Sequence, residues 1–320
     1  MASPAVRRRR LLVGAFAGIL LIAWGMNAIG DTEPKKASTP RATTSPSPSI
    51  TVPPLPPSAV PLTAEGFTFS PDACVAFPPT SGGPAKATVF LDAGHGGVDP
   101  GTGGRTSRGK RVREKTATLA VVKAATEQLR AAGYRVVVSR WADITVGVPR
   151  ASDIVNGVFN ADGARQDILA RVACANVSGA KALVSVHMNA FGLPSEGGAL
   201  TIWDPDRIFW RANQRLAGLL QNAVISQFHA AGWPVPDRGT LRDTKNHGTA
   251  LTEAGARYGH EALLGPYAKG WVSHPSHMPG AIIEPLFLTR PTEADIAYSA
   301  AGQAVLARAI LTAVEQFLSP

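Results

Sequence analysis

The part of the chain that is most informative about the fold is the stretch Ala87-Thr88-Val89-Phe90-Leu91-Asp92-Ala93-Gly94-His95-Gly96-Gly97. Its first five residues form a short apolar run, which predicts a buried strand. Glycines then surround His95 and let the backbone turn sharply, so the side chain at the strand tip can face a ligand. An ordinary glycine-rich turn with an incidental histidine is the alternative. A P-loop is excluded, because no Gly-Lys-Ser/Thr sequence follows.

Outward from this strand, strand patterns alternate with helical patterns to the end of the chain. Further strands are expected over 134–139, 182–187, 199–203 and 281–283, and helices over 114–132, 162–178, 207–231 and 292–318. This alternation predicts an α/β fold, a single domain with a central mixed, mostly parallel sheet flanked by helices on both faces. Sites in such sheets gather at the C-terminal ends of strands, where His95, His187 and Glu284 fall.

The N-terminal part of the chain differs in composition from this domain. In residues 1–30, four arginines precede an uncharged, largely apolar run, which indicates a signal peptide or a signal anchor. In both alternatives the rest of the chain is exported to the cell wall, the periplasmic space or the medium. An anchor would keep residues 11–29 in the membrane. Residues 31–62 are rich in Pro, Ser and Thr, so we expect a disordered linker there.

The sequence contains two cysteines, Cys74 and Cys174. Cys74 lies in an N-terminal arm, residues 63–84, and Cys174 lies in the domain expected over residues 85–320. In a reducing compartment they would be two free, buried thiols. In an exported protein an even pair indicates one disulfide. We therefore expect a bond that fastens the arm to the helix over 162–178.

The chain is basic, with a formal net charge of +9. Residues 1–30 carry four of these positive charges, so the remainder carries 9 − 4 = +5. A basic body suits an acidic polymer such as a cell wall, and it would also suit nucleic acid. The sequence shows no zinc-finger spacing, RNP-type aromatic motif or basic helix, so we expect no nucleic-acid partner. A basic, solvated surface without a specific partner is the other alternative.

Three further residues are candidates for chemistry beside His95. His187 ends an apolar run and could simply cap a strand. Glu114 begins a helix, where the helix dipole favours acids in any case. Glu284 follows a buried run and needs a partner, which a core salt bridge would also supply. Together, two histidines and a carboxylate form a common catalytic zinc set with a fourth position for water, and a second carboxylate can move the proton.

Several known motifs are missing from the sequence, and others are present in order. It lacks His-Glu-x-x-His and Gly-x-Ser-x-Gly, which argues against a thermolysin-type peptidase and a nucleophile-elbow hydrolase. The chain instead resembles the zinc N-acetylmuramoyl-L-alanine amidases from about residue 87 to its end. The matching elements are Phe90-Leu91-Asp92-Ala93-Gly94-His95-Gly96-Gly97 with Asp99-Pro100-Gly101, Ser139-Arg140-Trp141-Ala142-Asp143, Arg171 with Ala175-Asn176, Ser185-Val186-His187-Met188-Asn189-Ala190, Arg238-Gly239, Ile283-Glu284 with Phe287-Leu288, and Thr292-Glu293-Ala294.

This resemblance implies that residues 85–320 are a zinc amidase catalytic domain. It implies Zn2+ bound by His95, Glu114 and His187, with Glu284 as catalytic residue. The reaction would be hydrolysis of the amide bond between N-acetylmuramic acid and L-alanine in peptidoglycan, by zinc-activated water with Glu284 as general base and acid. Asn189 is a candidate donor to the oxyanion.

Two other functions stay open at this point, namely a catalytically silent peptidoglycan-binding or regulatory protein on the same fold, and a zinc peptidase acting on stem peptides. Peptidoglycan is the expected partner in each case. The N-terminal segment is expected to engage the membrane during export, and the protein is expected to be a monomer.

The chain departs from the family pattern in a few places. Leu286 stands where the family usually has glycine, and Thr289-Arg290 replaces Ser-Asn. The stretches 146–164 and 243–279 look inserted, and such long loops are often functional. We expect 243–279 to form part of the wall of the substrate cleft, a packed surface excursion being the alternative. The remaining histidines are expected at the surface or in loops, namely His229, His247, His260, His274 and His277.

Overall fold

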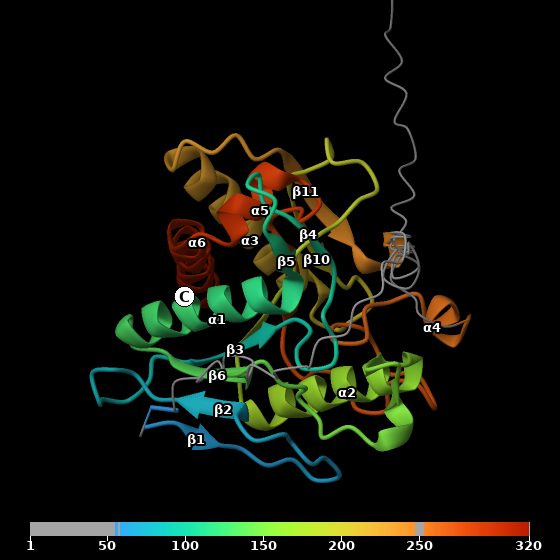
Figure 1. The fold of residues 1–320 in the computed structure, drawn as a ribbon. Coiled ribbons are helices and arrows are strands. Elements are labelled where there is room, and N and C mark those ends of the chain that lie inside the picture. Colours follow the sequence, from blue (N-terminus) through green and yellow to red (C-terminus); the bar gives the residue numbers. More distant parts are fainter. Residues whose placement is uncertain (1–54, 57, 247–252, 320) are drawn as a thin grey trace, which may run out of the picture.

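The computed structural model describes residues 55–56, 58–246 and 253–319 (Figure 1). The predicted signal or anchor segment and most of the predicted linker lie outside these residues. An eight-stranded sheet has the order β1-β2-β6-β3-β9-β12-β10-β11. Its strands are β1 Val60–Pro61, β2 Ala73–Phe77, β3 Thr88–Ala93, β6 Arg135–Arg140, β9 Ala182–Val186, β10 Ala199–Trp203, β11 Asp237–Arg242 and β12 Gly280–Glu284.

The middle of this sheet is parallel. Strands β6, β3, β9 and β12 run in one direction. The β2–β6 and β10–β12 pairs are antiparallel, and β11 runs parallel to β10. The expected mixed, mostly parallel sheet is therefore confirmed.

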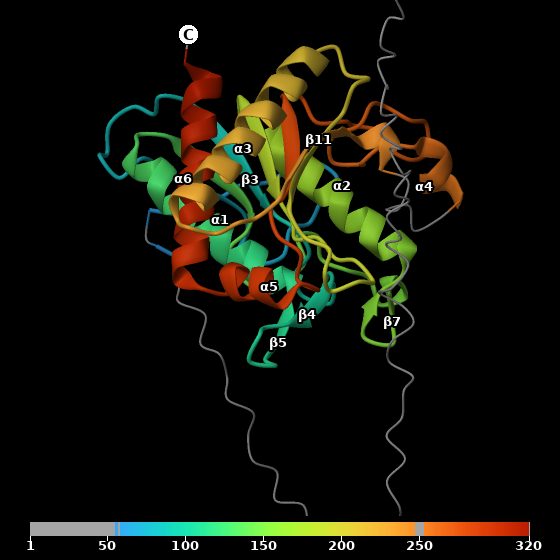
Figure 2. The same cartoon turned by 90° about the horizontal axis from the view of Figure 1, so that it is seen from above.

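Helices cover both faces of the sheet, as expected. α1, α3 and α6 lie together on one face and α2 lies on the other (Figures 1 and 2). Their bounds are α1 Glu114–Ala131, α2 Ala161–Ser178, α3 Trp210–Ala230 and α6 Ala300–Leu318. The shorter elements are α4 Glu253–Tyr258, α5 Pro291–Ala297, the β4 Gly103–Arg105 and β5 Arg111–Arg113 pair, the β7 Ile154–Val155 and β8 Val158–Phe159 pair, and the 3-10 turns η1 Ala151–Asp153 and η2 Asp243–Lys245.

The strand β3 shows why the central sheet is apolar on both faces. Val89 and Leu91 belong to the core formed with α1, α3 and α6, whereas Phe90 belongs to the core on the α2 side. Successive strand residues point to opposite faces, and helices cover both, so an almost continuous apolar run is needed. The ends of β3, β9 and β12 then carry the polar residues of the site.

The N-terminal arm contributes to the sheet. Its strand β2 pairs with β6, and β1 pairs with β2, so the sheet includes residues before residue 85. Cys74 on β2 and Cys174 on α2 form a disulfide. The predicted bond between the arm and this helix is therefore confirmed in the structure.

The C-terminal helical region differs from the sequence prediction. The single helix expected over 292–318 is two helices, α5 and α6, which are bent by 73°. The Ser299 side chain accepts a hydrogen bond from the Gly302 backbone N–H and so caps α6. A Cβ on Gly302 would lie 2.0 Å from the Ile296 carbonyl oxygen, so glycine allows this sharp bend. In the described part of the chain, the bent α5–α6 pair meets the length and composition of a membrane span, and no single helix does.

Candidate metal centre

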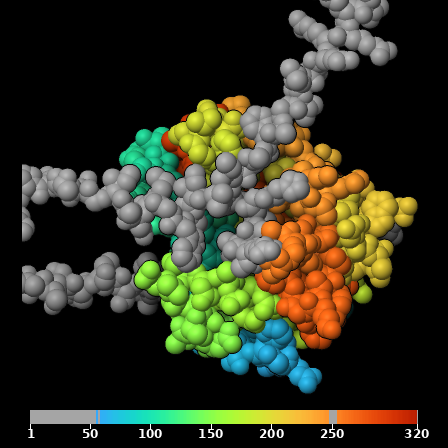
Figure 3. Space-filling view, turned by 90° about the vertical axis from the view of Figure 1, so that its right-hand side faces the viewer, coloured from blue at the N-terminus to red at the C-terminus, as the bar shows by residue number. Residues whose placement is uncertain are grey.

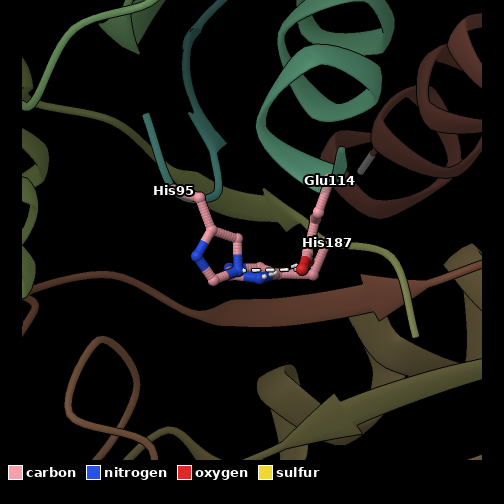
Figure 4. Close-up of side chains that lie close together, drawn as sticks. All are labelled: His95, Glu114 and His187. Carbon is pink, nitrogen blue, oxygen red and sulfur yellow. Dashed lines mark hydrogen bonds and ion pairs between the residues drawn. The ribbon is translucent and has the colours of Figure 1, made fainter. Parts of the chain in front are cut away.

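Three of the predicted site residues come together at one edge of the sheet. His95 follows β3, His187 follows the neighbouring parallel strand β9, and Glu114 begins α1. Their side chains point toward one another (Figure 4). His95 Nε2 lies 3.1 Å from Glu114 Oε2, and His187 Nδ1 lies 3.2 Å from Glu114 Oε1. The alternation of strands and helices thus brings together residues that are far apart in the sequence.

Glycines let the backbone approach these side chains closely. A Cβ on Gly94 would lie 2.4 Å from the ring of His187. Gly101 has a φ of +61°, and its Cβ would lie 2.6 Å from Glu114 Oε2. His95 itself has a φ of +61°, an uncommon conformation for a residue with a side chain. The turn after β3 therefore holds His95 in a strained conformation, which is typical of functional sites.

Two buried arginines hold the turn that carries His95. Arg140 donates hydrogen bonds to the carbonyl oxygens of Ala93 and Gly94, both at 3.0 Å. Arg171 donates to the carbonyl oxygens of Ala93 and His95, both at 2.7 Å. In the sequence both arginines stand out only as members of motifs. Their role in the turn depends on contacts between distant segments.

The Arg171 guanidinium is itself paired with buried carboxylates. It lies 2.7 Å from Asp92 and 2.9 Å from Asp167. Burial alone would raise the pKa of Asp92, but Arg171 and a hydrogen bond from Ser185 outweigh it and lower the pKa to about 2. Asp92 therefore stays ionised and balances the charge of Arg171.

A further carboxylate orients His95. His95 Nδ1 donates to Asp99 Oδ2 at 2.8 Å, which leaves Nε2 directed at Glu114. Burial alone would lower the pKa of His95, but Glu114 and Asp99 raise it to about 10. In the sequence Asp99 stands out only as part of the Asp99-Pro100-Gly101 motif. Its spacing of four residues from His95 within a glycine-rich turn was the available signal.

Glu114 is fixed by backbone donors. The Thr102 N–H donates to Oε2 and the Met188 N–H donates to Oε1, both at 2.8 Å. Burial alone would raise the pKa of Glu114, but the two histidines hold it well below its usual range. A negative carboxylate thus stands between two imidazole rings.

The geometry of this cluster fits a divalent metal ion. Zinc bonds of about 2.0–2.1 Å separate neighbouring ligand atoms by about 3.3 Å in a tetrahedral site. In this cluster the ring nitrogens of His95 and His187 lie 3.1 and 3.2 Å from different oxygens of Glu114, and one ligand atom from each of the three residues lies within 4.8 Å of the others. The Asp99–His95 hydrogen bond is also the usual way in which a carboxylate orients a metal-binding histidine. His95, Glu114 and His187 can therefore hold a metal with one position left open.

Glu284 stands at the end of β12, beside this cluster. Its Oε2 accepts a hydrogen bond of 2.7 Å from Asn189 Nδ2. Burial, together with the negative charges of Glu114 and Glu261, raises its pKa to about 8. The amide group of Asn189 therefore holds Glu284 in this structure, and its expected role as a donor to the oxyanion stays a prediction.

The loop after Glu284 is anchored by Glu293, whose carboxylate accepts from the backbone N–H of Phe287 at 2.8 Å and of Gly198 at 3.0 Å. Leu286, which departs from the family pattern, is fully buried in the core with α1, α3 and α6. This substitution therefore adds to packing and leaves the polar contacts of Glu284 intact.

The remaining histidines differ in their surroundings. His229, His274 and His277 are exposed, and His247 lies outside the described residues. His260 lies in a loop, as expected, but its side chain is only 12% exposed and lies 2.8 Å from Asp204. His260 is buried to this extent because its loop places it against Asp204 and Asp243, which follow β10 and β11.

Comparison with known proteins places the chain in a family. The sequence profile of N-acetylmuramoyl-L-alanine amidases matches residues 89–316. The chain belongs to this family. It is 25% identical over 254 residues to the N-acetylmuramoyl-L-alanine amidase AmiC of Neisseria meningitidis serogroup B, an alignment that covers 73% of this chain and 53% of that protein. The chain thus spans about half the length of this curated relative.

Solved structures share the fold. The CwlD amidase from Clostridioides difficile, solved in complex with the GerS lipoprotein, has a TM-score of 0.54 and 21% identity, over 72% of this chain and 98% of that one. An N-acetylmuramoyl-L-alanine amidase from Clostridium difficile 630 has a TM-score of 0.51 and 26% identity, over 74% and 98%. The amidase resemblance and the α/β fold predicted from the sequence are both confirmed.

Proposed function

We propose that this protein is a zinc-dependent N-acetylmuramoyl-L-alanine amidase. It hydrolyses the amide bond between N-acetylmuramic acid and L-alanine in peptidoglycan. The observation that carries the proposal is the cluster of His95, Glu114 and His187 beside Glu284, in a chain of the amidase family. A catalytic zinc site has three protein ligands and an open position, and this cluster has that composition.

The residues that would hold the metal are His95, Glu114 and His187. Two imidazoles with one carboxylate favour zinc over magnesium or calcium, which prefer oxygen ligands alone. When bound, zinc would lower the pKa of a water molecule toward about 7 and polarise the scissile carbonyl group. Asp99 keeps the Nε2 atom of His95 directed at the metal position.

Glu284 moves the proton in the proposed reaction. Its carboxylate takes a proton from the attacking water, whose oxygen forms a bond with the lactyl carbonyl carbon. The same group then returns the proton to the nitrogen of L-alanine as the C–N bond breaks. The hydrogen bond from Asn189 holds the Glu284 carboxylate in place for both transfers.

The inserted segment 243–279 is proposed to wall the substrate cleft. Arg165, near the start of α2, donates to the Trp271 carbonyl oxygen at 2.9 Å and stacks over the Trp271 ring at 5.0 Å. The orange atoms of this segment accordingly border the light green atoms that precede and begin α2 (Figure 3). The charge of Glu261 also contributes to the raised pKa of Glu284, so the segment comes near the catalytic carboxylate.

We also propose that the protein acts outside the cytoplasm, as a monomer whose partner is peptidoglycan. The disulfide supports this location, because disulfides persist in oxidising compartments. The proposed organisation is a signal peptide or anchor over 1–30, a linker from residue 31 that ends where β1 begins, and a catalytic domain over 85–320 whose sheet also includes β1 and the arm strand β2. The basic body suits an anionic wall.

Digestion of purified peptidoglycan by the purified protein tests the proposed function. Mass spectrometry should find stem peptides with a free L-alanine amino group and glycan with free lactyl groups. A chelator should abolish this release, and added zinc should restore it. The exposed His229→Ala variant serves as a control and should digest as the parent does. Cuts within stem peptides would indicate a peptidase, and binding without release would indicate a silent wall-binding protein.

A further inference from the structure

A second group of side chains that could bind a metal lies apart from the cluster of His95, Glu114 and His187. Asp204 follows β10, Asp243 follows β11, and His260 lies in the inserted segment. Strands β10 and β11 are parallel neighbours, so Asp204 and Asp243 stand at the same edge of the sheet. In the antiparallel β10–β12 pair, Glu284 faces Leu200 at the other end of β10. This group is therefore separate from the candidate catalytic centre.

The side chains of this group are buried, and three of their polar atoms make no hydrogen bond within the described residues. Asp204 and Asp243 are 0% and 3% exposed. His260 Nδ1 lies 2.8 Å from Asp204 Oδ2 and 3.5 Å from an oxygen of Asp243. Within the described ranges, His260 Nδ1, Asp204 Oδ2 and Asp243 Oδ1 nevertheless make no hydrogen bond. Buried polar atoms without hydrogen bonds are costly, and atoms this close are typical of ligands around a shared ion.

The other oxygen of each carboxylate is held by the backbone. The Asp206 N–H donates to Asp204 Oδ1 at 2.7 Å, and the Glu261 N–H donates to Asp243 Oδ2 at 3.1 Å. These bonds fix both carboxylates beside the space that they share with His260 Nδ1, where the nearest oxygens are Asp204 Oδ2 and Asp243 Oδ2. The carboxylate of Asp206 lies 3.6 Å from His260 Nε2, the ring nitrogen that faces away from this space. A carboxylate in this position is a usual companion of a metal-binding histidine.

A positive charge between the two carboxylates of this group would stabilise them. His260 Nδ1 lies within 3.5 Å of an oxygen of each carboxylate, so two buried negative charges would share one small space and repel each other. The nearby Arg207 guanidinium donates to the carbonyl oxygens of Leu264 and Gly265. A cation between the carboxylates would remove the repulsion. A single proton shared by the two carboxylates is the alternative that the experiment must exclude.

We infer that Asp204, Asp243 and His260 bind a second divalent metal ion, which fastens the segment 253–279 to the ends of β10 and β11. The imidazole favours a transition metal such as zinc over magnesium or calcium, which prefer oxygen ligands alone. The site is more enclosed than the first, because its carboxylates are fully buried. Its role is structural, since metal that binds only the folded chain stabilises it.

Counting metal ions tests this inference. The purified protein is stripped with a chelator, reloaded with excess zinc, desalted and measured by elemental mass spectrometry. We expect two zinc ions per chain for the parent and for the exposed control variant His229→Ala. His260→Ala should bind one, and so should His187→Ala, which disables the first site. One ion in the parent, or two in His260→Ala, would overturn the inference.

A second measurement leaves the proposed site intact, so it does not depend on how His260→Ala folds. The double variant His95→Ala/His187→Ala is titrated with zinc chloride in a calorimeter. We expect one equivalent to bind and the melting temperature to rise with added zinc. No binding would show that the carboxylates share a proton instead, and would overturn the inference. This outcome does not depend on amidase activity, so the two proposals can fail separately.

Discussion

The two clusters of potential metal ligands differ in how their members are held. In the first, His95 and His187 are about a quarter exposed, and Glu114 accepts two backbone hydrogen bonds. In the second, Asp204 and Asp243 have fully buried side chains, and three of the cluster's polar atoms lack hydrogen bonds. A fixed, partly open cluster suits catalysis, because water and substrate must reach the metal. A closed cluster suits a structural ion.

The largest expected effect is a loss of turnover at the first cluster without a loss of bound zinc. Glu284→Gln should lower turnover by about 10²–10⁴-fold, because general acid–base groups contribute this much. Its zinc content should match that of the parent, since Glu284 is not a proposed ligand. Rates on small muropeptides, measured beside the zinc content, check this expectation. Turnover near the parent level would remove Glu284 from the mechanism.

Loss of the disulfide should have a large effect on stability, with little effect on metal content. The bond joins residues 100 apart and ties β2 to α2, the helix whose Arg171 holds the His95 turn. Replacing Cys74 and Cys174 by alanine should lower the free energy of unfolding by about 4–5 kcal/mol on the chain-entropy model. Chemical denaturation of parent and variant measures this change. A decrease of less than about 1 kcal/mol would contradict it.

A smaller effect on zinc affinity is expected when the carboxylate that orients a histidine is neutralised in each cluster. Asp99 is 2.8 Å from His95, whereas Asp206 is 3.6 Å from His260 and 60% exposed. Asp99→Asn should weaken zinc binding at the first cluster by about 10–100-fold, the usual range for such residues. Asp206→Asn should weaken the second cluster less, because a longer and more exposed contact is screened by water. Competition with a chelator of known affinity measures both, and the reverse order would contradict the comparison.

Much of the first cluster could be predicted from local sequence. His95 and His187 follow short apolar runs that predict buried strands, and parallel strands bring their ends together. Glu114 begins a helical pattern, where the helix dipole favours an acid. The contacts of Asp99 and Asn189 could not be predicted, because they depend on the direction in which each side chain leaves its turn.

The second cluster could not be predicted, because its members come from three separate segments. Asp204 and Asp243 meet only because β10 pairs with β11, and His260 joins them only because the inserted segment folds back. The break between α5 and α6 has a similar cause. Its apolar pattern continues across Ser299, and the close approach of Gly302 to Ile296 is visible only after folding. Long-range contacts of this kind leave no periodic pattern in the sequence.

The most direct test of the central claim is an anomalous difference map, measured at the zinc absorption edge on crystals of the full protein grown with zinc. Our account predicts a peak about 2.0–2.2 Å from His95 Nε2, a Glu114 oxygen and a His187 ring nitrogen, with one position free of protein ligands. Glu284 should stand beside this peak without binding it. The absence of a peak at this position, or a peak there that includes Glu284 among its ligands, would contradict the account.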